Sequence, residues 1–253
     1  MEVDRGVARV LINRPDRLNA LSTAVFDQLI QVFAELDRSQ DVRAVCLAAA
    51  GDRAFSVGAD LKELQDRDGS GDPPYLPMTG PARNVYEVVL ECRKPTLAVL
   101  HGWVVGGGME LAMACDLRLA AEGTRLALPE SKVGMGANFG SQMLPRLVPM
   151  GIAYQMLYLG EPLDVEDALR VGLVNWVVPR DELDARAAAV AQDLTERAPV
   201  TLRRYKAMVQ IGSTLPIAAA LRLDPGPSPY LSEDRAEGTA AFVDKRAPRW
   251  TGR

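Results

Sequence analysis

The chain has 253 residues, of which 48% are hydrophobic and 25% charged, with a formal net charge of −4. This composition is typical of a globular protein with a sizeable core, and it excludes collagen-like, coiled-coil and disordered chains. The acidic balance argues against a nucleic-acid partner, because dedicated nucleic-acid binders usually carry excess positive charge.

Cysteine and histidine usage argues against a disulfide scaffold and a metal site. Cys46, Cys92 and Cys115 are far apart and odd in number, so we expect free thiols and a reducing, cytoplasmic compartment. His101 is the single histidine, and no metal-ligand spacing surrounds it. The longest apolar runs are shorter than the ~20 residues of a membrane-spanning helix, and no apolar signal core is present. We therefore expect a soluble protein without a membrane partner.

Strand and helix patterns alternate through the first part of the chain. Hydrophobic patterning predicts strands at residues 7–12, 42–48, 95–100 and 117–121, and helices at 18–37 (with Ser22 or Thr23 as N-cap) and 110–115. Residues 102–108 are glycine-rich, and residues 65–81 are rich in Gly, Pro and Asp; we expect both to be loops. The alternation indicates an α/β fold with mostly parallel strands.

The pattern changes near residue 183. Helices are predicted at 183–197, 200–211 and 232–245, with prolines between them. We therefore expect a core domain over 1–182 and a C-terminal helical region over 183–253.

The glycine run between residues 102 and 108 has two interpretations. It either bends the chain tightly between a strand and a helix, or lets backbone N–H groups approach a ligand at the helix N-terminus. Its spacing matches neither G-x-G-x-x-G nor a P-loop, so a nucleotide-phosphate site is weakly supported. No G-x-S-x-G elbow exists for a serine hydrolase, and we expect His101 to be structural.

Two glutamates stand out by their apolar surroundings. Glu110 lies in the first turn of an Ala-rich helix, and Glu130 follows an apolar strand and Pro129. Either residue is explained equally well as a carboxylate stabilised by a helix N-terminus. Periodicity alone does not bring the two side chains together.

The sequence resembles the crotonase, or enoyl-CoA hydratase/isomerase, superfamily from about residue 7 to residue 252. The motifs that carry the resemblance are, in order, NRPDRLNAL (13–21), AFSVGADLKEL (54–64), GWVVGGGMELAMACDLRLAA (102–121), LALPESKVGMG (126–136), LPRLV (144–148), GLVNWVVP (172–179) and EGTAAFVDKRAPRW (237–250). Together these motifs are specific for the superfamily, and less specific for one reaction within it. The resemblance implies a spiral of ββα units, with the C-terminal helical region forming a homotrimer or a homohexamer.

The resemblance also implies an acyl-CoA site. In this family the backbone N–H groups at the positions of Ala59 and Gly107 form an oxyanion hole for the thioester oxygen. Glu110 and Glu130 occupy the positions of the two glutamates that hydratases place over the Cα=Cβ bond. The implied reaction is reversible hydration of trans-2-enoyl-CoA, with Glu110 activating water and Glu130 as the acid. No cofactor is implied, because coenzyme A is part of the substrate.

Family position further implies residues that contact coenzyme A. These are Arg17, Leu18, Asp60, Leu61, Lys62, Phe242 and Lys245. Arg17 and Lys245 are equally explained as solvated surface charges, and Asp60 as a helix cap. Met78, Tyr86, Met135 and Phe139 are candidates for an apolar acyl pocket, with core packing as the alternative for each.

The chain departs from many relatives after Glu130, where it reads GMGANFGSQ instead of a Pro-x-x-Gly-Gly loop. Acyl-chain preference therefore does not transfer from the family. The alternatives to enoyl-CoA hydration are another acyl-CoA lyase or isomerase, for example one acting on a crotonobetainyl or aromatic-acid thioester, and a non-catalytic or RNA-binding relative. Both glutamates and Gly107 argue against the non-catalytic alternative.

Overall fold

The computed structural model describes residues 1–71, 78 and 81–253, and its strands in these ranges form two sheets. The larger sheet has the order β1 (Glu2–Asp4), β2 (Val7–Ile12), β3 (Ala44–Ala49), β5 (Thr96–Leu100), β7 (Leu117–Ala121) and β10 (Trp176–Val178). The smaller sheet has the order β4 (Ala54–Ser56), β6 (Trp103–Val105), β8 (Arg125–Ala127) and β9 (Leu163–Asp164). All described pairings between two named strands are parallel except β1 with β2 and β8 with β9, which confirms the predicted mostly parallel α/β class.

Helices connect and cover these strands. The α-helices of the described residues are α1 (Thr23–Arg38), α2 (Leu61–Ser70), α3 (Val85–Glu91), α4 (Gly107–Ala114), α5 (Asn138–Leu147), α6 (Met150–Leu159), α7 (Val165–Arg170), α8 (Leu183–Thr195), α9 (Pro199–Gly212), α10 (Ile217–Ala220) and α11 (Glu233–Val243). Short 3-10 helices span Pro15–Arg17, Glu130–Val133, Arg180–Glu182 and Pro229–Leu231. None of the helices in the described ranges combines the length and the apolar character needed to cross a bilayer.

A repeated ββα unit organises the core. Strands β3, β5 and β7 of the larger sheet are each followed by a strand of the smaller sheet, β4, β6 and β8, and then by helical structure. Because β4, β6 and β8 pair in parallel, their carboxyl ends lie at one edge of the smaller sheet. The segments that follow these three strands therefore meet in space.

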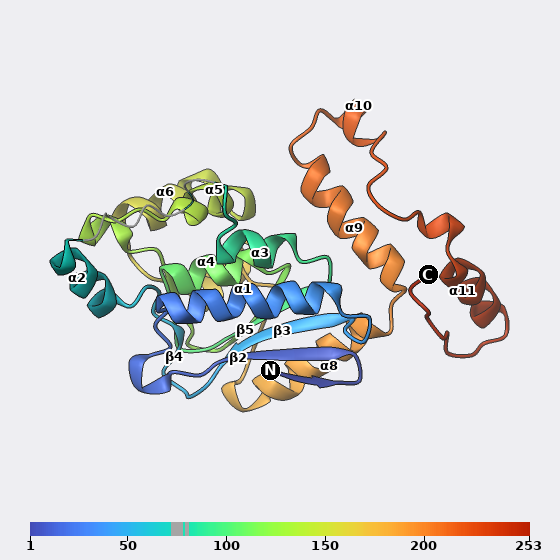
Figure 1. The fold of residues 1–253 in the computed structure, drawn as a ribbon, viewed down its shortest axis with the longest axis horizontal. Coiled ribbons are helices and arrows are strands. Elements are labelled where there is room, and N and C mark those ends of the chain that lie inside the picture. The colour runs from blue at the N-terminus through green and yellow to red at the C-terminus, as the bar shows by residue number, and fades with distance from the viewer. Residues whose placement is uncertain (72–77, 79–80) are drawn as a thin grey trace.

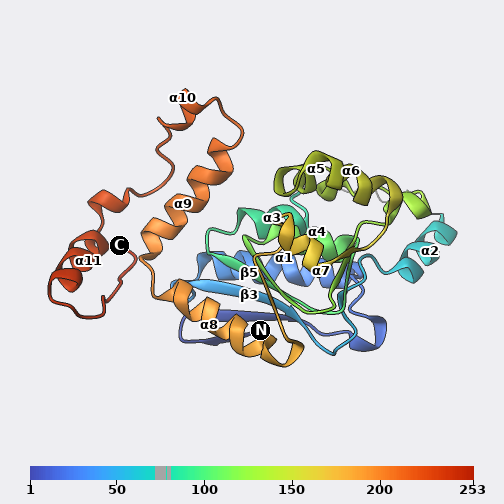
Figure 2. The ribbon, with the colours of Figure 1, turned by 180° about the vertical axis from the view of Figure 1, so that it is seen from behind.

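The larger sheet is buried on both faces. Val45 and Leu47 of β3 pack in the same cluster as Phe33 of α1 and Met109 of α4. Cys46 and Ala48 alternate with them and face α8. Figure 1 and Figure 2 accordingly place α1, α3 and α4 on one side of the sheet and α8 on the other. Burial on both faces explains why β3 and β5 are continuous apolar runs.

The helix expected at 18–37 starts later than predicted. It begins at Thr23, where the Ser22 hydroxyl caps it by accepting from the Val25 N–H. Leu18 and Asn19 instead have φ of 51° and 56°. The buried Asn19 amide donates to the Ala50 and Ala54 carbonyls, at 2.9 and 2.8 Å. These tertiary hydrogen bonds hold 18–22 outside the helix and tie it to the start of β4.

Both predicted loops contain regular structure. Residues 61–70 form α2, so the expectation of a loop was wrong for 65–70; residues 72–77 and 79–80 of the same expected loop lie outside the described residues. In the glycine-rich segment 102–108, Trp103–Val105 form β6, and α4 starts at Gly107, three residues before the predicted start at Glu110. Three residues are too few for a period-2 pattern to be recognised.

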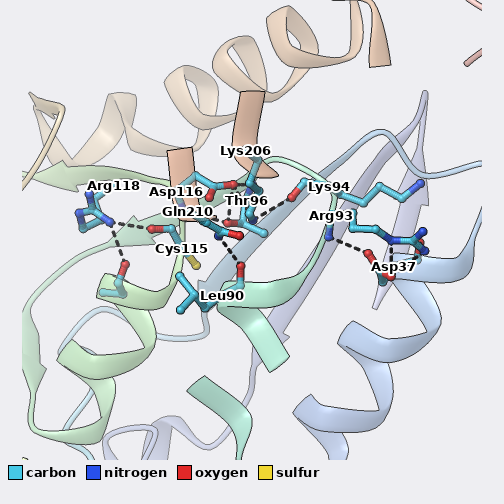
Figure 3. A network of polar contacts seen from close by, with 11 residues as sticks. Asp37, Leu90, Arg93, Lys94, Thr96, Cys115, Asp116, Arg118, Lys206 and Gln210 are labelled. Atoms are coloured by element: carbon cyan, nitrogen blue, oxygen red, sulfur yellow. Dashed lines mark hydrogen bonds and ion pairs between the residues drawn. The ribbon is translucent and has the colours of Figure 1, made fainter. Parts of the chain in front are cut away.

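The C-terminal helices divide into two groups. Helix α8 packs on the larger sheet through Leu183, Ala187, Val190 and Ala191. Helices α9, α10 and α11 extend away from the sheets in both ribbon views (Figure 1, Figure 2). The C-terminal half of α9 is fixed to the core by polar contacts (Figure 3): Lys206 Nζ lies 2.9 Å from Asp116 Oδ2, and Gln210 donates to the Leu90 carbonyl at 2.7 Å.

Candidate active site

Three segments that follow β4, β6 and β8 converge at the edge of the smaller sheet. Ala59 lies just after β4, Gly107 is the first residue of α4 after β6, and Glu130 begins the 3-10 helix after β8. Glu110 lies in the first turn of α4. The fold thus gathers the four residues that the family resemblance assigned to the oxyanion hole and the carboxyl pair.

Ala59 is held in an extended conformation by pairing with Leu21. The Leu21 N–H donates to the Gly58 carbonyl at 2.8 Å, and the Asp60 N–H donates to the Leu21 carbonyl at 3.1 Å. In a parallel bridge the N–H of the central residue points away from its partner strand. Accordingly, neither the Ala59 N–H nor the Gly107 N–H donates a hydrogen bond to any residue that the structure describes.

Gly58 allows the two amides to approach each other. Its φ is +84°, and a Cβ at this position would stand 2.9 Å from both the Gly107 nitrogen and the Val105 carbonyl oxygen. Any other residue would therefore separate the two segments or strain the backbone. The start of α4 adds the positive end of the helix dipole to the same place. The arrangement can stabilise an oxyanion that reaches both amides.

Glu110 is buried beneath the start of α4, with 6% of its surface exposed. Its Oε1 accepts a hydrogen bond from the Gly140 N–H at 2.7 Å, and the Tyr86 hydroxyl and the Phe139 backbone approach the carboxylate as further donors that favour its charged form. Burial raises the pKa of Glu110 above its ordinary value, whereas these donors oppose the rise because they stabilise the charged form.

Glu130 has different surroundings. Its Oε1 lies 2.9 Å from the point where a Cβ on Gly106 would stand, beside the start of α4. Its Oε2 is buried without a hydrogen-bond partner among the described residues. Burial, together with the negative charge of Glu110, raises the pKa of Glu130 to about 7. The carboxyls are thus close enough to interact, and Glu130 retains a proton more readily than an ordinary glutamate.

The predicted contacts to coenzyme A form two separate groups. Leu18 is half-buried, and Arg17, Leu61 and Lys62 are exposed at the ends of the segments that hold Ala59. Asp60 Oδ2 lies 3.0 Å from Arg14. Burial raises the pKa of Asp60, but the hydrogen bond and charge of Arg14 outweigh it, so the net pKa is lowered. Its side chain makes no capping hydrogen bond to α2.

Phe242 and Lys245 lie elsewhere in the chain. Phe242 is 87% exposed on α11, and Lys245 follows this helix. Figure 1 places α11 and α2 at opposite ends of the folded molecule. Within one chain, Phe242 and Lys245 therefore lie far from Leu61 and Lys62. The contacts of all seven residues with coenzyme A remain predictions.

Sequence reasoning missed the polar groups around Glu110. Tyr86 and Phe139 were candidates for an apolar pocket, and the structure does pack their rings against each other, with centroids 5.4 Å apart. The approach of the Tyr86 hydroxyl to Glu110 had no signal in the pattern, because the two residues lie on different helices, α3 and α4. The Gly140 N–H likewise belongs to a segment that departs from the family pattern.

His101 does not join the carboxyl pair. It is 2% exposed and lines a small pocket under α8 with Arg180 and Asp184, and its Nε2 is buried without a partner in the described chain. Burial lowers the pKa of His101. No group of three His, Cys, Asp or Glu side chains within the described ranges is arranged to hold a metal ion.

Comparison with known proteins gives the same family as the resemblance in the sequence. The family model described as enoyl-CoA hydratase/isomerase matches residues 2–253. The short-chain-enoyl-CoA hydratase of Clostridium acetobutylicum is 33% identical and aligns with 97% of this chain and 94% of its own length. The (E)-benzylidenesuccinyl-CoA hydratase of Thauera aromatica is also 33% identical, with 100% and 98% covered.

Solved structures give the same result. The crystal structure of enoyl-CoA hydratase from Bacillus anthracis superposes with a TM-score of 0.89 at 29% identity, covering 100% of this chain and 98% of that one. The chain therefore belongs to the enoyl-CoA hydratase/isomerase family and has the crotonase fold. Within that family it is an enzyme of the hydratase type.

Proposed function

We propose that the protein catalyses the reversible addition of water to trans-2-enoyl-CoA, giving 3-hydroxyacyl-CoA. The observation that carries the proposal is the juxtaposition of two backbone N–H groups without partners in the described chain, Ala59 and Gly107, with two carboxyls, the buried Glu110 and the half-buried Glu130. The water adds without net oxidation or reduction, and coenzyme A is carried by the substrate, so the proposed reaction uses no separate cofactor.

The two amides are proposed to bind the thioester oxygen. When water attacks Cβ, negative charge develops on this oxygen as the enolate forms. Donors that are already in place stabilise this charge more than the neutral carbonyl, so they lower the barrier. Losing one such donor typically costs about 10²–10³-fold in rate.

The two carboxyls are proposed to divide the proton transfers. Glu110 accepts a hydrogen bond from the Gly140 N–H, and the nearby Tyr86 and Phe139 donors also favour its charged form, which suits it to remove a proton from water as the oxygen attacks Cβ. Glu130 retains a proton up to about pH 7 and delivers it to Cα. The step leaves Glu110 protonated and Glu130 ionised, and return of one proton from Glu110 to Glu130, directly or through solvent, restores the starting state.

The direct test is turnover of a panel of short, long, branched and aromatic enoyl-CoA thioesters. We expect loss of the enoyl-thioester absorbance and a product heavier by one water in mass spectrometry. No change with any thioester would contradict hydration and favour an acyl-CoA isomerase or another lyase of the same family.

Aromatic enoyl-CoA thioesters are the second candidate substrates. The rings of Tyr86, Phe139 and Phe26 form a cluster next to Glu110, which could contact a flat aryl group. The relative from Thauera aromatica is named for an aryl-substituted substrate. A higher kcat/KM for cinnamoyl-CoA than for crotonyl-CoA would support this assignment.

The region 183–253 is proposed to form a homotrimer, alone or paired into a homohexamer. Large apolar side chains are exposed on the helices that extend from the core, including Val209, Ile217 and Leu221, at 70%, 74% and 67%. Burial of such a surface against other copies would remove it from water. Light scattering that reports a mass of three or six chains would support the proposal, and a monomer would contradict it.

A cytoplasmic location and a role in fatty-acid β-oxidation are also proposals. They rest on the family and on Cys46, Cys92 and Cys115, which are all buried free thiols. Cell fractionation, and accumulation of enoyl-CoA in a deletion strain, would test them.

A further inference from the structure

Tyr86 is fixed beside the carboxyl pair by its helix and by two aromatic rings. It lies in the first turn of α3, which starts with a capping box between Asn84 and Glu87. Its ring packs on Phe139, with centroids 5.4 Å apart, and meets Phe26 edge-on at 6.2 Å. This packing restricts the phenol to one orientation.

The hydroxyl of Tyr86 points to the centre of the site. It lies 2.6 Å from the point where a Cβ on Gly107 would stand, three residues before Glu110 in α4, and it approaches the Glu110 carboxylate as a donor that favours its charged form. One hydroxyl group therefore borders both the carboxyl proposed to activate water and the glycine whose N–H is proposed to bind the thioester oxygen. A tyrosine that only filled the core would not need a polar atom at this position.

Hydrogen bonds to a carboxylate in a buried site favour its ionised form. Glu110 has the Tyr86 hydroxyl and the Gly140 N–H, whereas Glu130 Oε2 has no partner in the described chain. The two carboxyls would otherwise compete for the same proton. A hydrogen-bond donor beside only one of the two carboxyls favours the ionised form of that carboxyl, so the proton stays on the other one.

We propose that Tyr86 is a positioning residue that keeps Glu110 ionised and oriented toward the attacking water. The assignment rests on the proposed hydratase function. Tyr86 itself transfers no proton in this account; it acts only through Glu110.

The kinetic test is the pH profile of kcat/KM for Tyr86→Phe with crotonyl-CoA. Removing the donor destabilises the charged form of Glu110, so the acidic limb should move up by about one pH unit. The rate at low pH should fall about tenfold, the deficit should shrink as pH rises, and KM should change little. Tyr154→Phe is the matched control, because this ring is 48% exposed on α6 and, among the rings that the structure describes, stacks on Tyr158 alone; it should keep the wild-type profile.

A second measurement does not depend on turnover. The carboxyl carbon of Glu110, labelled with ¹³C and assigned by its loss in Glu110→Gln, can be titrated by NMR in the free enzyme. Its midpoint should be higher in Tyr86→Phe than in the wild type. Identical midpoints, or a rate loss that is equal at every pH, would overturn the proposal. If the wild type hydrates no enoyl-CoA, the proposed function fails, while the titration still tests the role of Tyr86.

Discussion

Glu110 and Glu130 have different neighbours, although Glu110 lies in the first turn of α4 and Glu130 stands beside the start of the same helix. Glu110 is surrounded by donors, the nearest being the Gly140 N–H at 2.7 Å, while Glu130 has one buried oxygen without a partner in the described chain. Burial raises the pKa of both side chains, and the charge of Glu110 adds to the rise at Glu130. Different surroundings of this kind allow two identical side chains to act as base and acid.

Replacing Glu130 tests its proposed role as the acid. Glu130→Gln keeps the shape of the side chain but removes its proton, so kcat should fall by roughly 10²–10⁴-fold with nearly unchanged binding of coenzyme A thioesters. Glu35→Gln on the exposed face of α1 is the control and should behave as wild type. Equal loss of turnover and of binding would mean that Glu130 has a structural or binding role.

The pH dependence of hydration should report the raised pKa of Glu130. This carboxyl must be protonated to deliver a proton to Cα, and it loses that proton as pH rises through about 7. The kcat/KM for hydration should therefore decline above about pH 7, and the residual activity of Glu130→Gln should lack this limb. A wild-type rate that is constant from pH 6 to pH 9 would contradict the assignment.

The sequence identified these two glutamates only through the family resemblance. Helical periodicity places Glu110 near a helix start, but nothing local links it to Glu130, because the contact depends on parallel pairing of β6 and β8. The donors to Glu110 were not predicted for the same reason. Tyr86 and Gly140 reach it from α3 and α5, which lie on either side of α4 in the chain.

At the scale of elements, the ββα unit explains how short strands position the residues of the site. Strands β4, β6 and β8 have three residues each, yet their carboxyl ends set the positions of Ala59, Gly107 and Glu130. Gly58 joins the first two of these segments through its close approach to the Gly107 nitrogen. The distance between the two amides therefore depends on a residue that has no side chain.

Gly58→Ala tests this close approach. The added Cβ would stand 2.9 Å from the Gly107 nitrogen and would push the amides apart, so kcat should fall by about 10²-fold. Gly123→Ala is the matched control: φ is similar, +73° against +84°, but nothing lies within 4 Å. It should cost about 1 kcal/mol of stability, measured by denaturant unfolding, and leave kcat unchanged. Equal activities in the two variants would contradict the role of Gly58.

The sequence predicted long or strongly apolar elements better than short ones. Strand β2 has the predicted bounds, as does β7, while β3 and β5 differ by one or two residues at an end. Strand β6 was missed within the glycine run, and residues 18–22 were wrongly placed in a helix. In both cases tertiary contacts, such as the hydrogen bonds of Asn19, determine a conformation that local propensity does not favour.

At the scale of the whole molecule, α9 joins the core to the helices that extend from it. Lys206 is nearly buried at this junction, with 9% of its side chain exposed, and Asp116 also accepts from the backbone and hydroxyl of Thr96. The network in Figure 3 therefore connects α9 to β5 and to the turn after α4. The structural stability of the C-terminal region should depend on this network.

Lys206→Met tests the junction. Loss of the ammonium leaves Asp116 partly uncompensated, so we expect a destabilisation of about 1–3 kcal/mol and faster amide hydrogen exchange in α9. Asp224→Asn, in the segment that follows α10, is the control, because the side chain of Asp224 is 82% exposed in its pair with Arg204 of α9, and this pair should contribute less than about 1 kcal/mol. Unchanged exchange in α9 of Lys206→Met would show that the network does not hold the helix.

A crystal structure of the protein with bound 3-hydroxybutyryl-CoA would test the proposed oxyanion hole and carboxyl pair together. We expect the thioester oxygen to lie within about 3.2 Å of both the Ala59 and the Gly107 nitrogens. We also expect the carboxyls of Glu110 and Glu130 to face the 3-hydroxyl group and Cα. A thioester oxygen that contacts neither amide, or carboxyls that point away from the 3-hydroxyl group and Cα, would contradict the proposed site.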